Sequence, residues 1–147
     1  RVMDHWGHQV TVLDSNKKRL EYLNDLSINA EIGIKDFQKF SYIIECTGNA
    51  ISAKKMLKNS AMSSTMLLLG LPYDKQIVNL EDIVSSDKRI IGSVGSNGKN
   101  FSDAINLAPQ LNLKNFNQSV FVFDQWESAW DEHKTKKQVK VKLKIGS

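Results

Sequence analysis

The stretch Val10-Thr11-Val12-Leu13-Asp14-Ser15-Asn16-Lys17-Lys18-Arg19 decides how this chain is expected to fold. Its first four residues are apolar or β-branched, which predicts a short buried strand over 10–13. Asp14 ends that strand, and residues 16–24 then follow a helical pattern with Leu20 and Leu23 on one face. A strand that passes through an acidic residue directly into a helix is typical of α/β folds.

The same alternation continues along the chain. Further strands are expected over 31–34, 42–46, 66–69 and 89–94, and further helices over 50–57, 81–85 and 101–107. Such short spacing predicts a doubly wound parallel sheet with helices on both faces. After Pro109 we expect a strand over 120–123, a helix over 125–132 and a half-buried strand whose inner face is Val139, Val141, Leu143 and Ile145. The division expected is one α/β domain over 1–111 and a β-α-β extension over 112–147.

Composition limits the class of protein. Of the 147 residues, 41% are hydrophobic and 24% charged, which is ordinary for a soluble globular domain. No apolar run approaches the ~20 residues of a membrane span, so no membrane partner is expected. The net charge of +4 gathers in the tail 133–145. A nucleic-acid surface is one interpretation of that charge, but lysines that alternate with apolar residues favour a solvated strand face.

The single cysteine, Cys46, excludes an internal disulfide and a multi-cysteine zinc site, which indicates a cytoplasmic protein. Cys46 itself is expected in the core, because it lies on an apolar strand. Trp126 and Trp130, four residues apart on one expected helix, are interpreted as core or interface residues.

Asp14 is the sharpest chemical signal. In a dinucleotide-binding unit, an acidic residue at the end of a strand accepts the adenosine ribose hydroxyls, about 20 residues beyond a Gly-rich turn that holds the pyrophosphate. Counting back from Asp14 passes Arg1, so we expect that turn, and the central strand before it, to lie upstream of Arg1. The strands over 10–13 and 42–46 would then flank an empty position and not bond to each other. The alternative is that Asp14 is an ordinary turn residue.

Arg19 lies one turn into the expected helix, within reach of an adenosine group at Asp14. A solvated basic helix start is the other interpretation. Cations at a helix N-terminus oppose the helix dipole, which favours a specific reason for this charge.

Four segments together resemble the zinc-type medium-chain alcohol and polyol dehydrogenases. They are 10–19, Ile43-Ile44-Glu45-Cys46-Thr47-Gly48, Leu67-Leu68-Leu69-Gly70-Leu71-Pro72 and Ile90-Ile91-Gly92-Ser93-Val94-Gly95. They occur in the order and at the spacing of that family, and the resemblance runs from residue 1 to about 111. The stretch 92–101 and the β-rich ending most resemble the archaeal-type glucose dehydrogenases, although Gly95 stands where that branch often has asparagine.

The resemblance implies a Rossmann-type cofactor domain and a role for each matching position. Asp14 would bind the adenosine ribose with Arg19 beside it, and Thr47 and Gly48 would line the adenine and ribose side. The nicotinamide end would be met by the backbone of Leu69, Gly70 and Leu71 and by Ser93, Val94 and Gly95. The cofactor implied is NAD, with NADP possible, and the reaction is hydride transfer to or from an alcohol, polyol or aldose sugar.

Zinc is implied only in the catalytic lobe, which lies outside these residues, so no metal ligand and no catalytic residue is expected here. The chain alone is expected to be inactive, and the whole protein to be a homo-oligomer. The alternative from another class is a non-catalytic nucleotide-sensing Rossmann module. Such a sensor needs nothing like the segments 69–72 and 91–95, and these favour the dehydrogenase.

Overall fold

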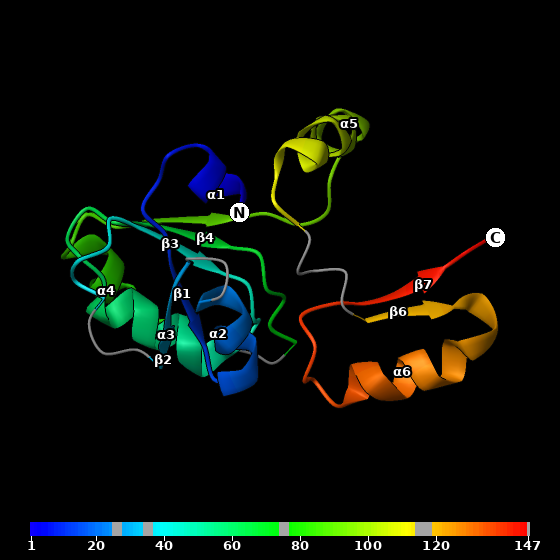
Figure 1. Ribbon diagram of the computed structural model, residues 1–147. Helices are drawn as coiled ribbons and strands as arrows, with labels where there is room; N and C mark the ends of the chain where they lie inside the picture. The colour runs from blue at the N-terminus through cyan, green and yellow to red at the C-terminus, as the bar shows by residue number, and fades with distance from the viewer. Residues whose placement is uncertain (25–27, 34–36, 74–76, 114–118, 147) are drawn as a thin grey trace. The chain divides into compact units, whose positions relative to one another are not determined.

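The computed structural model describes residues 1–24, 28–33, 37–73, 77–113 and 119–146. It divides into two compact units: Arg1–Ile34 with Asn97–Ser147 form the first, and Lys35–Ser96 form the second. The described strands form three parallel sheets, β1–β2 and β6–β7 in the first unit and β3–β4–β5 in the second (Figure 1). Each unit is therefore built from strands that need a crossover connection, and helices provide most of these.

In the first unit, a short helix α1 (Val2–His5) precedes strand β1 (Thr11–Asp14), which pairs with β2 (Asn29–Ile32). Helix α2 (Lys17–Asn24) connects the two strands and packs on both, with Leu20 buried. The helix begins after Asn16, whose side-chain Oδ1 accepts hydrogen bonds from the backbone amides of Lys18 and Arg19 at 3.0 and 3.3 Å. Asn16 thus satisfies amides that a first helical turn leaves without partners.

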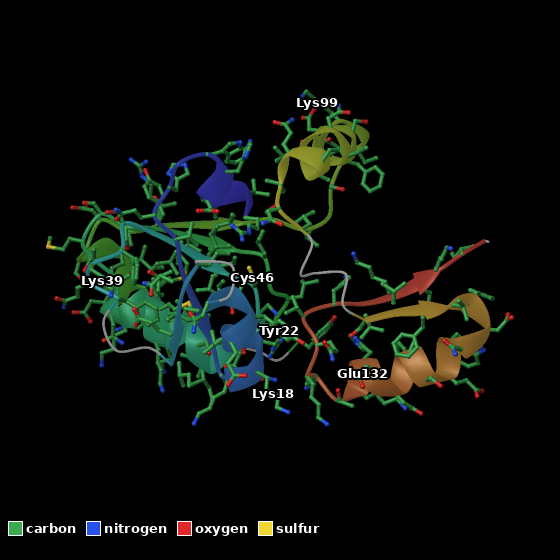
Figure 2. All side chains as sticks on the ribbon, in the orientation of Figure 1. Lys18, Tyr22, Lys39, Cys46, Lys99 and Glu132 are labelled. Atoms are coloured by element: carbon green, nitrogen blue, oxygen red, sulfur yellow. The ribbon has the colours of Figure 1, made fainter. Side chains whose placement is uncertain are left out.

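The rest of the first unit comes from the end of the chain. It comprises α5 (Gly98–Leu107), the 3-10 helices η1 (Ala108–Gln110) and η3 (Phe123–Gln125), β6 (Ser119–Val122), α6 (Trp126–Lys134) and β7 (Val141–Lys144). Helix α6 crosses between the parallel strands β6 and β7 and packs on both (Figure 1). The Asn16 side chain donates to the carbonyl of Lys136 at 2.8 Å. The hydroxyl of Tyr22, labelled on α2 in Figure 2, donates to Gln138 Oε1 at 3.3 Å. These bonds hold the 136–138 segment against the start of the chain.

The second unit is a three-stranded parallel sheet of β3 (Tyr42–Glu45), β4 (Thr65–Leu68) and β5 (Arg89–Gly92), with β4 in the centre. Helices α3 (Ala50–Asn59) and α4 (Glu81–Val84) supply the connections. Buried side chains include Ile43 and Met66 from the strands and Met56 and Leu57 from α3. Asn49 caps α3 by accepting from the Ser52 amide at 3.1 Å. At its other end, the ammonium of buried Lys88 donates to the carbonyl of Leu57 at 2.6 Å.

Most expected elements are present within one to three residues of their expected bounds, and every described strand pair is parallel. The strand expected over 31–34 instead covers Asn29–Ile32 and ends before Gly33, whose φ is +71°. A bond from Asn29 Nδ2 to Thr11 Oγ1, at 3.0 Å, accompanies this register. Residue 34 lies outside the described residues. Strands β1 and β3 belong to separate sheets, and the expected spacing between them stays a prediction.

Two expectations about burial were wrong. Cys46 is exposed, because the strand alternates: Ile43 and Glu45 are buried, whereas Tyr42, Ile44 and Cys46 share the exposed face. In the last strand only the earlier part is half-buried; Leu143 is exposed, and Ile145 lies beyond the end of β7 and is 83% exposed. Trp126 and Trp130 are exposed on α6, so of their two interpretations the core is excluded and the interface stays a prediction.

Candidate functional site

The site is built from the loops that leave the carboxyl ends of the strands. In the second unit the strand ends are aligned, with Glu45 opposite Leu68 and Leu68 opposite Gly92. The segments that follow therefore leave one edge of the sheet side by side. They contain the expected cofactor-lining residues Thr47, Gly48, Leu69, Gly70, Leu71, Ser93, Val94 and Gly95. In open α/β sheets this edge is where ligands bind.

The loop after β3 is organised by Glu45. Its side chain is 2% exposed, and its carboxylate accepts from the Thr47 amide at 2.8 Å, from the Thr47 hydroxyl and from the Gly48 amide at 3.0 Å. The Thr47 hydroxyl in turn accepts from the Asn49 amide at 3.0 Å, at the start of α3. The buried charge is thus met by donors of its own turn, and none of the described residues forms a salt bridge to it.

The loops after β3 and β4 touch through glycine backbone. A Cβ added at Gly70 would lie 2.0 Å from the nitrogen and 2.6 Å from the Cα of Gly48. A Cβ added at Gly48, whose φ is +67°, would lie 2.6 Å from the carbonyl oxygen of Leu71. No other residue type fits this approach, so the two glycines are required by the packing of one loop on the other. The space beside each glycine is filled by the protein's own backbone and not left open for a ligand.

The loop after β5 is more open. The Ser93 amide continues the ladder by donating to the carbonyl of Leu68 at 3.0 Å. Val94 is 77% exposed, and Gly95 has a φ of +68° with no heavy atom within 4 Å of an added Cβ. Leu71, after β4, is also exposed. Groups at this edge are accessible to a ligand.

Asp14 and Arg19 form a separate pair in the first unit. The guanidinium of Arg19 donates to Asp14 Oδ1 at 3.1 Å, and the amide of Asn16 donates to the same oxygen at 2.9 Å. Among the described residues, none donates to Asp14 Oδ2, and the side chain is 24% exposed. Arg19 Nε is buried and has no hydrogen-bond partner among the described residues. The pair therefore keeps one acceptor open.

Sequence reasoning did not single out Glu45. The sequence does contain a signal that could have identified it, because Glu45 is the one acidic residue in the otherwise largely apolar stretch 42–46. A carboxylate buried in such a strand needs hydrogen-bond partners. The neighbouring Cys46, labelled in Figure 2, responds to that charge. Partial burial raises the pKa of the Cys46 thiol, and the adjacent negative charge of Glu45 raises it further.

Beneath the loops, a mainly apolar pocket of about 130 Å³ lies among the sheet and its helices, and its lining includes Glu45, Gly48, Ala53, Leu57, Met66 and Ile90. Sites for drug-sized ligands are larger, about 300–1,000 Å³, so this pocket is too small for a dinucleotide. In the part of the chain that the structure describes, no group of three or more His, Cys, Asp or Glu could hold a metal ion. Nor is any described helix long and apolar enough to cross a membrane.

Comparison with known proteins agrees with this arrangement. The family model described as zinc-binding dehydrogenase matches residues 2–110. A short-chain alcohol dehydrogenase of E. coli CFT073 in complex with NADH gives a TM-score of 0.80 at 17% identity, covering 97% of this chain and 46% of that one. The Haloferax mediterranei glucose dehydrogenase in complex with NADP, Zn and gluconolactone gives 0.76 at 19% identity, covering 93% and 43%.

Benzyl alcohol dehydrogenase from Acinetobacter calcoaceticus gives a TM-score of 0.74 at 21% identity, covering 92% of this chain and 42% of that one. No curated protein sequence matches the chain significantly. The chain spans less than half the length of each of these three structures. Because the family model matches residues 2–110, the chain belongs to the family of zinc-binding dehydrogenases.

Proposed function

We propose that this chain is the cofactor-binding part of an oxidoreductase that transfers hydride between NAD(P) and an alcohol, polyol or aldose sugar. The observation that carries the proposal is Asp14, which ends β1 inside a family match and keeps Oδ2 without a donor from the described residues. A ribose supplies two hydroxyl donors, which a carboxylate oxygen accepts. Two proteins of the same fold are complexed with NADH and with NADP, which supports a nicotinamide cofactor.

The residues of the first unit fit the adenosine end of NAD. Asp14 Oδ1 is occupied by Arg19 and Asn16, which fixes the orientation of the carboxylate and directs the remaining oxygen to the ribose. The Arg19 side chain is 35% exposed, and among the described residues its guanidinium donates only to Asp14, so N–H groups of the guanidinium remain for the adenosine side. Thr47 and Gly48 of the second unit are proposed to line the adenine and ribose side.

The nicotinamide end is proposed to meet Leu69, Gly70, Leu71, Ser93, Val94 and Gly95. Some of their backbone amides already donate to other residues of the protein and so cannot bind the nicotinamide. The amides of Leu69 and Gly70 donate to the Glu45 carbonyl at 2.8 and 3.1 Å, and the Ser93 amide donates to Leu68. Carbonyl oxygens of these loops, and the amides of Val94 and Gly95, are the groups we assign to the nicotinamide carboxamide, which both donates and accepts.

When bound, the cofactor supplies the hydride chemistry, and the protein supplies binding and orientation. Zinc ligands are proposed to lie in the catalytic lobe and not in this chain. Consequently, the 147-residue chain alone should produce no NADH with any alcohol or sugar, with or without added zinc. Measurable turnover by the purified chain would overturn this division of labour between the lobes.

The cofactor preference tests the role of Asp14 in the complete protein. The carboxylate repels a 2′-phosphate by about 4 kcal/mol per charge pair at ~4 Å and an effective dielectric near 20, before screening. Lys17, Lys18 and Arg19 offset part of this repulsion. We expect kcat/KM to be about ten-fold higher with NAD than with NADP, a difference of roughly 1.4 kcal/mol. A clear preference for NADP would remove Asp14 from its proposed role, and binding of either cofactor without any turnover would favour a nucleotide sensor.

Within this function we propose a glucose dehydrogenase-like substrate, a homo-oligomeric protein and a cytoplasmic location. Support for the sugar comes from the stretch 92–101, whereas Gly95 departs from the asparagine that is common in that branch. Rates of the complete protein with glucose, a polyol and a primary alcohol would rank the three substrate classes.

A further inference from the structure

Four backbone amides from two different loops donate to one residue, Glu45. Its carboxylate takes the amides of Thr47 and Gly48 at 2.8 and 3.0 Å, from the loop after β3. Its carbonyl oxygen takes the amides of Leu69 and Gly70 at 2.8 and 3.1 Å, from the loop after β4. The side chain is 2% exposed. A single residue therefore fixes the start of both loops.

Direct contact between the loops completes the arrangement. The space for a Cβ at Gly70 is taken by Gly48 backbone and, at 2.7 Å, by Glu45 Oε2. The space for a Cβ at Gly48 is taken by the carbonyl of Leu71. A shift of the Thr47–Gly48 turn would therefore strike the Gly70–Leu71 backbone, and neither loop can move alone.

Holding a carboxylate in the interior is costly unless it is fully hydrogen-bonded, and an apolar side chain would fill a strand end at lower cost. The described residues offer Glu45 no cation, only donors of the Thr47–Gly48 turn. The charged side chain therefore serves to fix the geometry of the Thr47–Gly48 turn. The loops it fixes are the ones that carry the proposed cofactor-lining residues.

We propose that Glu45 is a positioning residue that couples the two loops into one preformed binding surface for the dinucleotide. The inference rests on the proposed function, since it assigns the surface to a nicotinamide cofactor. Glu45 acts through Thr47, Gly48, Leu69 and Gly70 and is not proposed to touch the cofactor. The loops then bind without first being ordered, which reduces the entropic cost of association.

The test compares NADH binding by the complete wild-type protein and by Glu45→Gln, measured by fluorescence titration at a temperature where both are folded. The substitution keeps size and shape. One amide oxygen still accepts from Thr47, but the NH₂ group in place of Oε2 faces the Gly48 amide, donor against donor. We expect the Kd for NADH to rise about ten-fold, with a higher KM for the cofactor and little change in kcat.

A matched control separates this effect from general destabilisation. Lys88 is buried in the same unit and bonds to the Leu57 carbonyl of α3, and it makes no hydrogen bond to a described residue of either loop. Lys88→Met should lower the free energy of unfolding and leave the Kd for NADH within about two-fold of the wild type. An unchanged Kd in folded Glu45→Gln, or an equal rise in both variants, would overturn the proposal. A wild-type protein that binds neither NADH nor NADPH would instead overturn the proposed function.

Hydrogen exchange of the wild type gives a second measurement that does not depend on the variant folding. If the two loops are one body, the amides of Thr47, Gly48, Leu69 and Gly70 open together. Their protection factors should then agree within about three-fold and rise by a common factor when NADH binds. The coupling would be refuted if the amides of Thr47 and Gly48 had protection factors more than about ten-fold lower than those of Leu69 and Gly70.

Discussion

Asp14 and Glu45 are two carboxylates in equivalent local positions, each the last residue of a parallel strand, yet they differ in surroundings. Both accept a hydrogen bond from the amide two residues further on, Asn16 at 2.9 Å and Thr47 at 2.8 Å. Asp14 is 24% exposed, is paired with Arg19 and has an oxygen that no described residue donates to. Glu45 is 2% exposed, and both of its oxygens are occupied by its own turn.

The length of the side chain and the strand face on which it lies explain why the two carboxylates have different roles. Glu45 lies on the buried face that alternation also gives to Ile43, so its carboxylate can only fold back on the loop. Asp14 is shorter and half-buried, and the Arg19 guanidinium leaves part of it accessible. One carboxylate therefore organises protein backbone, and the other is available to a ligand.

The largest effect is expected from the glycine contact beside Glu45. Gly70→Ala places a Cβ 2.0 Å from the Gly48 nitrogen, which backbone cannot accommodate without moving the loop. We expect the free energy of unfolding to fall by about 3 kcal/mol or more, measured by urea denaturation of the whole chain. Gly92→Ala is the control, because nothing lies within 4 Å of its added Cβ and its φ is not positive; it should cost under about 1 kcal/mol. Equal losses would mean that the loops do not touch.

The two carboxylates can be compared directly by truncation. Glu45→Ala removes the acceptor of two part-buried amides, those of Thr47 and Gly48, and we expect a total loss of about 1–3 kcal/mol. Asp14→Ala removes a partly exposed ion pair and one turn bond, worth about 1 kcal/mol. Denaturation midpoints of the two variants should therefore differ clearly, with Glu45→Ala the less stable. The reverse order would contradict the division of tasks.

The Asp14 turn can be probed through its neighbour Asn16. Asn16→Ala removes the cap of α2 and the bond to the Lys136 carbonyl, so it should cost roughly 1–2 kcal/mol. Asn97→Ala is matched to it, because Asn97 caps α5 through the Asn100 amide at 2.8 Å and has no such second bond among those described. We expect the Asn16 variant to be less stable by about 0.5–1 kcal/mol, as measured by thermal or urea unfolding. Equal losses would show that the Lys136 bond adds nothing.

The smallest effect concerns Cys46, which reports the charge of Glu45. Its thiol pKa is raised by partial burial and by that charge, so below the pKa less of it is thiolate than in a free cysteine. Alkylation by iodoacetamide at pH 8 should therefore be slower than for a model thiol. In Glu45→Gln the charge is gone, the pKa falls toward its ordinary value, and alkylation should be about two- to five-fold faster. If the alkylation rate were unchanged in this variant, the charge of Glu45 would not be a cause of the raised pKa of Cys46.

Much of this fold is encoded locally and could be predicted. The strands over 11–14, 42–45 and 65–68 follow from apolar runs that end at polar or small residues, and Asp14 is recognisable because it directly follows such a run. The start of β2 depends on its pairing with β1, including the bond between Asn29 and Thr11. Residues near Asn29 in the sequence do not reveal that pairing, so the start of the strand could not be predicted from them.

Burial along a strand was the main source of error. An apolar run does not reveal which face is covered, so Cys46 was placed in the core although it alternates with buried Glu45. Glu45 was overlooked for the same reason, and two of its four amide partners, Leu69 and Gly70, reach it only when β3 and β4 pair. Contacts between loops are a property of the assembled sheet.

The bond from Asn16 to Lys136 joins residues 120 positions apart and has a consequence for synthesis on the ribosome. The second unit, Lys35–Ser96, is one continuous stretch, whereas the first unit combines the beginning of the chain with its end. During synthesis at ~5–20 residues per second, the continuous unit is complete seconds before residue 136 emerges. The α2 turn with Asp14 must wait for its last partners, and such long-range closure is slow. The loops around Glu45 are therefore assembled first, and the carboxylate left open for a ligand acquires its full support last.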